Sequence, residues 1–238
     1  MEQKLFTKNF TLLVLGQASS LFGNYILRLA LSMYVLEVTG SAAVFAGILS
    51  IATIPTILLS PIGGILADRA DRRNIMVALD TLTGIFVLCA AVFLSGDNAV
   101  VVISVLLVIL SVLGAFETPT VQACIPQMLA GDNIIKGNAV VNQVASISYL
   151  IAPLLGGILY SAVGLKPVMY ASVVCFFVTA LFECFIKLGY QAREFQGNVL
   201  SMVKNDFSSS IRFIMKEQPT IMKMLLLAAF SRFFVMGV

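Results

Sequence analysis

Polar side chains recur at helical spacing along an apolar stretch near the start of the chain. Gln17, Asn24 and Arg28 share one face if this stretch is a helix. Such a face is unsuited to lipid, and an arginine in apolar surroundings needs a bundle interior or a wet cavity. Further along, Asn142 and Tyr149 form a second polar stripe. We expect these five residues to line a central cavity for an amphiphilic small molecule, the alternative for any one being an interhelical hydrogen bond.

Acidic residues within apolar stretches are the next candidates for chemistry. Glu117 stands out because a carboxyl group in such surroundings can take up and release a proton. Alternatively, it pairs with Arg28 or with the charged hairpin described below. Glu183 lies one turn from Lys187, where a solvated ion pair suffices, and Asp80 is expected close to the membrane surface. Glu117 is therefore our candidate for proton coupling.

The residue types that the chain lacks exclude several classes of site. It has no histidine, which removes imidazole bases and the common zinc motifs. Its four cysteines fall within apolar stretches without Cys-x-x-Cys spacing. The net charge of +3 is spread over short loops without a basic stripe, which argues against nucleic acid as a partner. We expect no catalytic residues, no metal site and no cofactor.

The elements that position these residues are long apolar segments. Hydrophobic residues make up 59% of the chain and charged residues 11%, far from the soluble averages of about 45–50% and about 25%. The segments cover approximately 10–36, 43–66, 74–95, 99–128, 138–163 and 167–186. Crossing a bilayer takes about 20 apolar residues, and short connections join antiparallel neighbours. The sequence therefore predicts an all-α membrane protein with a six-helix transmembrane bundle.

A charged hairpin orients this bundle. Asp68-Arg69-Ala70-Asp71-Arg72-Arg73 joins the second and third segments. If the amino terminus is cytoplasmic, the loop lysines and arginines face inward and Lys166 faces out, as the positive-inside rule requires. We predict a multi-pass protein of the plasma (inner) membrane with its amino terminus in the cytoplasm.

The chain is expected to contain three regions. Residues 1–187 form the transmembrane bundle. Residues 188–219 form a cytoplasmic amphipathic linker, because Val199, Val203 and Phe207 recur at helical spacing among charges. Residues 220–238 start a seventh transmembrane helix that stops short of a crossing, so we expect a truncated chain whose carboxy-terminal half is missing.

An internal similarity suggests two related triplets of helices. Residues 60–66 read Ser-Pro-Ile-Gly-Gly-Ile-Leu, and residues 152–159 read Ala-Pro-Leu-Leu-Gly-Gly-Ile-Leu. The two motifs fall in the second and fifth segments. Three crossings per triplet give the copies opposite topology, so we expect two inverted three-helix repeats.

The hairpin carries a family resemblance. Residues 64–73 are similar to the Gly-x-Leu-(Gly/Ala)-Asp-Arg-x-Gly-Arg-(Arg/Lys) signature between helices 2 and 3 of the major facilitator superfamily of secondary transporters. Asp71 departs from it, since glycine is usual there. Ion pairs and helix capping at this corner would hold one conformation closed on the inner side. The predicted conformational latch comprises Gly64, Asp68, Arg69, Arg72 and Arg73, the alternative being a plain topology anchor.

The fifth segment adds to the resemblance. Residues 148–157 resemble the exporter pattern Gly-x-x-x-Gly-Pro-x-x-Gly-Gly, with Pro153, Gly156 and Gly157 matching and Ser148 and Ala152 in place of glycines. Residues 22–24 and 37–42 resemble the branch of bacterial macrolide and siderophore exporters.

The resemblance implies a secondary active transporter, the amino-terminal half of a twelve-helix protein. We expect export of a drug-like or amphiphilic natural product by alternating access, with proton entry as the candidate driving force. The expected partners are a small-molecule substrate, the lipid bilayer, protons and the missing carboxy-terminal half. An importer of the same superfamily and a half-length membrane interaction module remain alternatives. An intramembrane enzyme is not expected, because no nucleophile, base or metal set stands at workable spacing.

Overall fold

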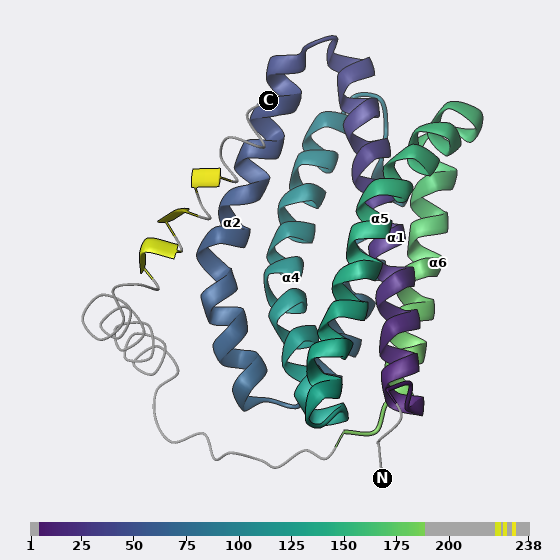
Figure 1. Cartoon of the computed structure of the whole chain (residues 1–238). Coiled ribbons are helices and arrows are strands. Elements are labelled where there is room, and N and C mark those ends of the chain that lie inside the picture. Colours follow the sequence, from purple (N-terminus) through teal and green to yellow (C-terminus); the bar gives the residue numbers. More distant parts are fainter. Residues whose placement is uncertain (1–4, 189–221, 225, 228–229, 232–238) are drawn as a thin grey trace. The chain divides into compact units, whose positions relative to one another are not determined.

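The computed structural model describes residues 5–188, 222–224, 226–227 and 230–231 (Figure 1). Six long helices run through the first of these ranges: α1 (Lys8–Thr39), α2 (Ala42–Arg69), α3 (Arg72–Phe93), α4 (Ala99–Met128), α5 (Asp132–Val163) and α6 (Leu165–Cys184). Each is long and apolar enough to cross a membrane. The expected all-helical membrane fold is confirmed, with every helix overlapping a predicted apolar segment.

The chain divides into two compact units, Met1–Arg193 and Glu194–Val238, and the bundle lies in the first. In the second unit, residues 222–224, 226–227 and 230–231 are helical, where the start of a seventh helix was predicted. Apart from its first residue, the linker predicted at 188–219 lies outside the described residues.

Local capping chemistry places the first helix ends. Thr7 precedes α1 and its hydroxyl accepts the Phe10 N–H at 3.3 Å. Gly40 ends α1 with φ of +60°, in the left-handed region that glycine tolerates best. Ser41 then caps α2 by accepting the Val44 N–H at 3.3 Å. Two adjacent residues thus reverse the chain between two membrane-length helices.

Interhelix packing follows the predicted pair of triplets. The helix α2 packs mainly on α4, and its counterpart α5 packs mainly on α1. The α1–α6 contact likewise has its counterpart in α4–α3, and the α3–α6 contact maps onto itself. Exchanging α1, α2 and α3 for α4, α5 and α6 therefore reproduces the main contacts of the bundle, as an internal repeat requires.

A glycine enables the close approach in each half. A Cβ placed on Gly63 would lie 2.5 Å from the carbonyl oxygen of Ala115 in α4. A Cβ on Gly156 of α5 would lie 3.1 Å from the Cα and the carbonyl oxygen of Ile26 in α1. Gly63 and Gly156 occupy equivalent places in the two repeated motifs, so the same small-residue contact recurs.

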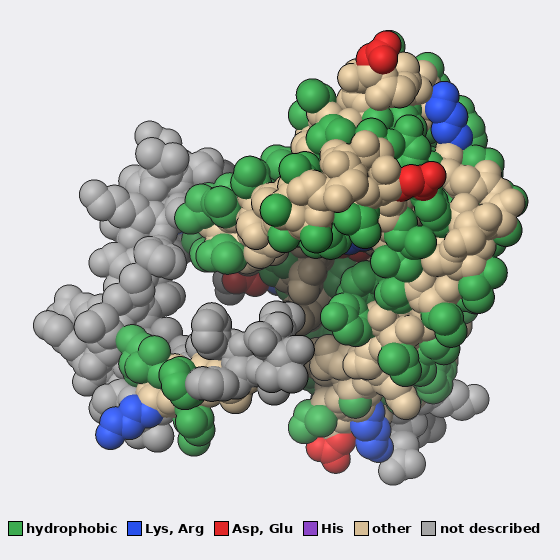
Figure 2. Space-filling view, turned by 90° about the horizontal axis from the view of Figure 1, so that it is seen from above, with side chains coloured by type: hydrophobic (Ala, Val, Ile, Leu, Met, Phe, Trp, Pro, Cys, Tyr) green, Lys and Arg blue, Asp and Glu red, His purple; other side chains and the backbone are tan. Residues whose placement is uncertain are grey.

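The bundle is covered unevenly. In the apolar windows of α2 and α5, 6% and 17% of residues are buried, against 39–44% in the other four helices. The most exposed apolar side chains include Ile57 and Leu58 of α2 and Leu150 and Leu154 of α5. Seen from one end, the bundle carries hydrophobic side chains over its outside and few charges (Figure 2). Such a surface suits lipid or further apolar helices.

Candidate transport cavity

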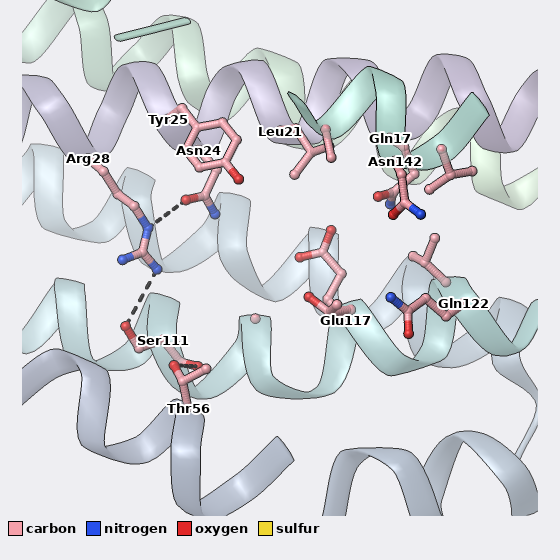
Figure 3. Close-up of a pocket in the computed structure, with 15 residues that line it drawn as sticks. Gln17, Leu21, Asn24, Tyr25, Arg28, Thr56, Ser111, Glu117, Gln122 and Asn142 are labelled. Atoms are coloured by element: carbon pink, nitrogen blue, oxygen red, sulfur yellow. Dashed lines mark hydrogen bonds between the residues drawn. The ribbon is translucent and has the colours of Figure 1, made fainter. Parts of the chain in front are cut away.

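A polar cavity of about 400 Å³ lies among α1, α2, α4 and α5 (Figure 3). Its polar wall comes from all four helices, so tertiary packing brings together residues that are distant in sequence. The lining residues are Gln17, Leu21, Asn24, Tyr25, Arg28, Thr56, Ser111, Gly114, Glu117, Thr118, Val121, Gln122, Val141, Asn142 and Ala145. Because apolar residues flank these polar groups, the cavity has the mixed lining of a small-molecule site.

Arg28 occupies one end of the cavity. Its Nε donates to the Asn24 side-chain oxygen at 2.7 Å, and a terminal nitrogen donates to the Ser111 hydroxyl at 3.5 Å (Figure 3). Thr56 holds this corner together by donating to the Ser111 carbonyl oxygen at 3.1 Å. Within residues 5–188, no carboxylate forms an ion pair with Arg28. The guanidinium thus retains donors for a polar or anionic group of a bound solute.

Glu117 projects from α4 between the two ends of the cavity (Figure 3). Its carboxylate accepts a hydrogen bond from the Ser20 hydroxyl of α1 at 3.3 Å. At the end away from Arg28, the cavity is lined by the side-chain amides of Gln17, Gln122 and Asn142 (Figure 3). The cavity therefore offers a cationic end, an acidic middle and an amide end.

The structure gathers most residues that the sequence assigned to a cavity. Gln17, Asn24, Arg28, Asn142 and the proton candidate Glu117 all line it.

Tyr149 is placed differently. Its side chain is 65% exposed and outside the lining set, with its ring edge-on to Tyr25 at a centroid distance of 5.6 Å. Tyr25 itself lines the cavity, so Tyr149 packs on a cavity-lining ring without lining the cavity itself. Tyr25, Thr56 and Ser111 were not predicted to line the cavity, because isolated polar residues in apolar helices carry no periodic signal.

The hairpin residues form a compact corner between α2 and α3. Arg72 lies 3.6 Å from the Asp68 carboxylate, and its Nε donates to the Ala67 carbonyl oxygen at 2.7 Å. Arg73 donates to the Cys184 carbonyl oxygen at 2.5 Å and so joins α3 to the end of α6. Arg69 is the last residue of α2. A Cβ on Gly64 would meet nothing within 4 Å, so the tight contact belongs to Gly63.

Asp71, the departure from the family signature, has a definite local role. Its carboxylate accepts the backbone N–H groups of Arg73 at 3.1 Å and Asn74 at 3.4 Å, which caps the start of α3. An acidic cap also suits the positive end of the helix dipole.

Two acidic residues lie elsewhere than expected. Asp80 and Glu183 are each 1% exposed, so neither carboxyl group lies at a solvated membrane surface. Lys187 does not pair with Glu183: its backbone exchanges hydrogen bonds with the Asn9 side chain, and its side chain is exposed. The ion pair between Glu183 and Lys187 was predicted from their one-turn spacing on a helix. That spacing does not apply, because α6 ends at Cys184, before Lys187.

The sequence of this chain matches one family profile and several curated proteins. The sequence profile of the Major Facilitator Superfamily matches residues 13–238. Macrolide efflux protein A of Streptococcus pyogenes is 30% identical over 162 residues, which cover 67% of this chain and 40% of that protein. The Staphyloferrin A transporter of Staphylococcus aureus is 27% identical over 67% of this chain and 41% of its own length.

The putative bacilysin exporter BacE of Bacillus subtilis is 27% identical over 79% of this chain and 46% of its own length. The chain thus spans less than half the length of these curated relatives. The matched profile covers nearly all of the sequence, including the six membrane-length helices, the hairpin signature and the cavity. The chain therefore belongs to the Major Facilitator Superfamily of transporters.

Proposed function

We propose that this chain forms one six-helix bundle of a secondary active exporter that moves an amphiphilic small molecule by alternating access. The observation that carries the proposal is the cavity among α1, α2, α4 and α5, where Arg28 and Glu117 lie within helices that are apolar enough to cross a membrane. Ionisable groups are costly within a membrane and are retained where they line a pathway for solute or ions. A second bundle would complete the cavity and rock against this one.

The cavity lining favours a solute with both apolar and polar parts. Leu21, Val121 and Val141 supply apolar contact area, while the guanidinium, carboxyl and amide groups select polar substituents. Relatives are named for macrolides, staphyloferrin A and bacilysin, and two of these names specify efflux or export. We therefore assign the chain to export of drug-like or natural-product amphiphiles.

The hairpin corner serves as the conformational latch in this proposal. The Asp68–Arg72 ion pair and the Arg73 bond to the end of α6 connect α2, α3 and α6. Breaking these contacts would free the corner during the conformational change. In this proposal the corner and the amino terminus lie on the cytoplasmic side of the plasma membrane, because that orientation satisfies the positive-inside rule.

Export is tested by measuring accumulation in cells that express the full-length protein, with a panel of macrolides, siderophores and peptide antibiotics. Cells with the wild-type protein should accumulate less of at least one compound. Arg28→Gln should raise the concentration for half-maximal export of that compound about tenfold or more, since a hydrogen bond to a charged group contributes about 1.5–3 kcal/mol. Lys166→Gln, at an exposed position, is the matched control and should behave as wild type. An unchanged accumulation for the whole panel, or full export by Arg28→Gln, would contradict the proposal.

A further inference from the structure

A buried network of carboxyl groups extends from the cavity into the interior of the bundle. Asp80 of α3 and Glu183 of α6 are each 1% exposed, and their carboxyl groups lie close enough to interact with each other. The Ser20 hydroxyl of α1 lies 2.9 Å from Asp80 Oδ1 and 3.3 Å from Glu117 Oε1. Four helices thus contribute to one chain of polar groups, from Glu183 through Asp80 and Ser20 to Glu117.

The hydrogen bonds of this network require one of its carboxyl groups to be protonated. An ionised carboxylate only accepts, so Asp80 and Glu183 can bond to each other only if one of them is protonated. A serine hydroxyl has a single proton to donate, so Ser20 satisfies both neighbouring carboxyl groups fully only when one of them donates in return.

Unpartnered atoms at the same place indicate a missing proton independently. Asp80 Oδ2 and Glu183 Oε2 are buried without a hydrogen-bond partner, and so is the amide nitrogen of Gln17, a residue only 5% exposed. Gln17 approaches Glu117 without a well-formed hydrogen bond. Orphaned polar atoms are expensive in a bundle interior, and a proton shared by the carboxyl pair would remove two of them.

The surroundings favour a proton over a balancing cation. Across residues 5–188, no lysine or arginine forms an ion pair with Asp80 or Glu183, and no group of three metal-ligating side chains is suitably arranged. The titratable and charged groups whose fields reach the network are Arg28 and Tyr25 at Glu117, and Cys124 and Cys184 at Glu183. Two like charges this close and this dry cannot both remain ionised.

We propose that Asp80 and Glu183 hold one exchangeable proton between them, and that Ser20 relays it to and from Glu117 at the cavity wall. The step is a proton transfer alone. The Ser20 hydroxyl gives its proton to the ionised carboxylate on one side while it takes a proton from the protonated carboxyl group on the other, so a single positive charge moves and only O–H bonds break and form. The inference rests on the proposed transport function for its use, since this is where a proton gradient would act on the solute cavity.

The proton is tested directly by infrared spectroscopy of the purified full-length protein in lipid nanodiscs. At neutral pH, the wild type should show the carbonyl stretch of a protonated carboxyl group. Asp80→Asn and Glu183→Gln should each remove that band, whereas Asp97→Asn, at an exposed loop position, should keep it. An undiminished band in both buried variants would overturn the proposal, and so would a band lost only in Glu117→Gln. Near-isosteric amides limit damage to the fold, which thermal unfolding checks.

Coupling is tested by transport of a radiolabelled macrolide into proteoliposomes. With one proton exchanged per neutral solute, a pH difference of one unit supports up to about tenfold accumulation. Asp80→Asn and Glu183→Gln should reduce this to about onefold while exchange without a gradient continues, and Ser20→Ala should slow gradient-driven uptake about tenfold. Gradient-driven accumulation at wild-type levels in the two amide variants would refute the coupling role. A wild type that transports no compound of the whole panel would instead contradict the proposed function, while the infrared result still decides the proton site.

Discussion

At the scale of single residues, Asp71 shows how a departure from a family pattern can be structurally productive. Glycine at this position would leave the first N–H groups of α3 without a side-chain acceptor. The aspartate accepts two of them and fixes where α3 starts. The resulting helix start places Arg72 within reach of Asp68 and Arg73 within reach of the end of α6. The residue that differs from the signature thus supports the residues that match it.

Replacing this cap should weaken the hairpin corner in a graded way. Asp71→Ala should lower the free energy of unfolding by about 1 kcal/mol, whereas Asp71→Asn should retain most of the cap and Asp71→Gly should cost only a few tenths. Thermal unfolding of the detergent-solubilised protein measures the difference. Equal stability of Asp71→Ala and Asp71→Asn would show that the capping bonds contribute nothing.

At the scale of helices, the repeated glycine pair explains why α2 and α5 approach their neighbours so closely. In each motif the first glycine faces the backbone of the adjacent helix and the second does not. A Cβ on Gly63 would collide with Ala115, and one on Gly64 would find open space. In α5, a Cβ on Gly156 would press on Ile26, while one on Gly157 would make an ordinary contact of 3.7 Å with Leu29.

This difference predicts opposite effects for adjacent substitutions. Gly63→Ala should destabilise the bundle by about 1–3 kcal/mol, because the obstructing atom belongs to backbone and cannot rotate away. Gly64→Ala should be neutral or stabilising by up to about 1 kcal/mol, since alanine favours the helix. Thermal unfolding of the two variants side by side is the measurement. A similar loss in both would indicate that helix flexibility, rather than interhelix clearance, is what these glycines provide.

The helices themselves were predictable because length and apolar composition decide membrane crossing almost alone. The cavity was partly predictable: Gln17, Asn24 and Arg28 share a face at helical spacing, and that signal is local. Contacts between helices are not local. Nothing near Glu183 in the sequence indicates that it lies beside Asp80. Lys187 is closer in sequence and was the predicted partner, but α6 ends at Cys184, before Lys187. Tyr149 was predicted to line the cavity but lies outside its lining set, for the same reason. A polar stripe on a helix does not say which neighbouring side chain covers it.

At the scale of the whole molecule, six crossings fix the sides of all loops together. If the amino terminus is cytoplasmic, the α2–α3 corner lies inside and the turn between α3 and α4 lies outside. Charge follows this division, because the arginine-rich corner and the loop near Ser95 and Asp97 differ sharply in positive charge.

Labelling of intact cells tests this topology. The exposed Cys89 and Cys184 are first changed to serine, and a single cysteine is then introduced as Ser95→Cys or Ala70→Cys. The two variants should differ completely in their labelling by a membrane-impermeant maleimide. Ser95→Cys should react from outside, and Ala70→Cys only after permeabilisation. Labelling of Ala70→Cys in intact cells would show that the protein has the opposite orientation to the one predicted.

The claim that depends most on the structure is that the cavity among α1, α2, α4 and α5 binds the exported solute. Asn142→Cys places a thiol on the cavity wall, and Tyr149→Cys places one beside it as a matched control. At ten times its dissociation constant, a transported solute should slow maleimide labelling of Asn142→Cys about tenfold by mass action and leave Tyr149→Cys unaffected. Equal labelling of Asn142→Cys with and without the solute would contradict the account.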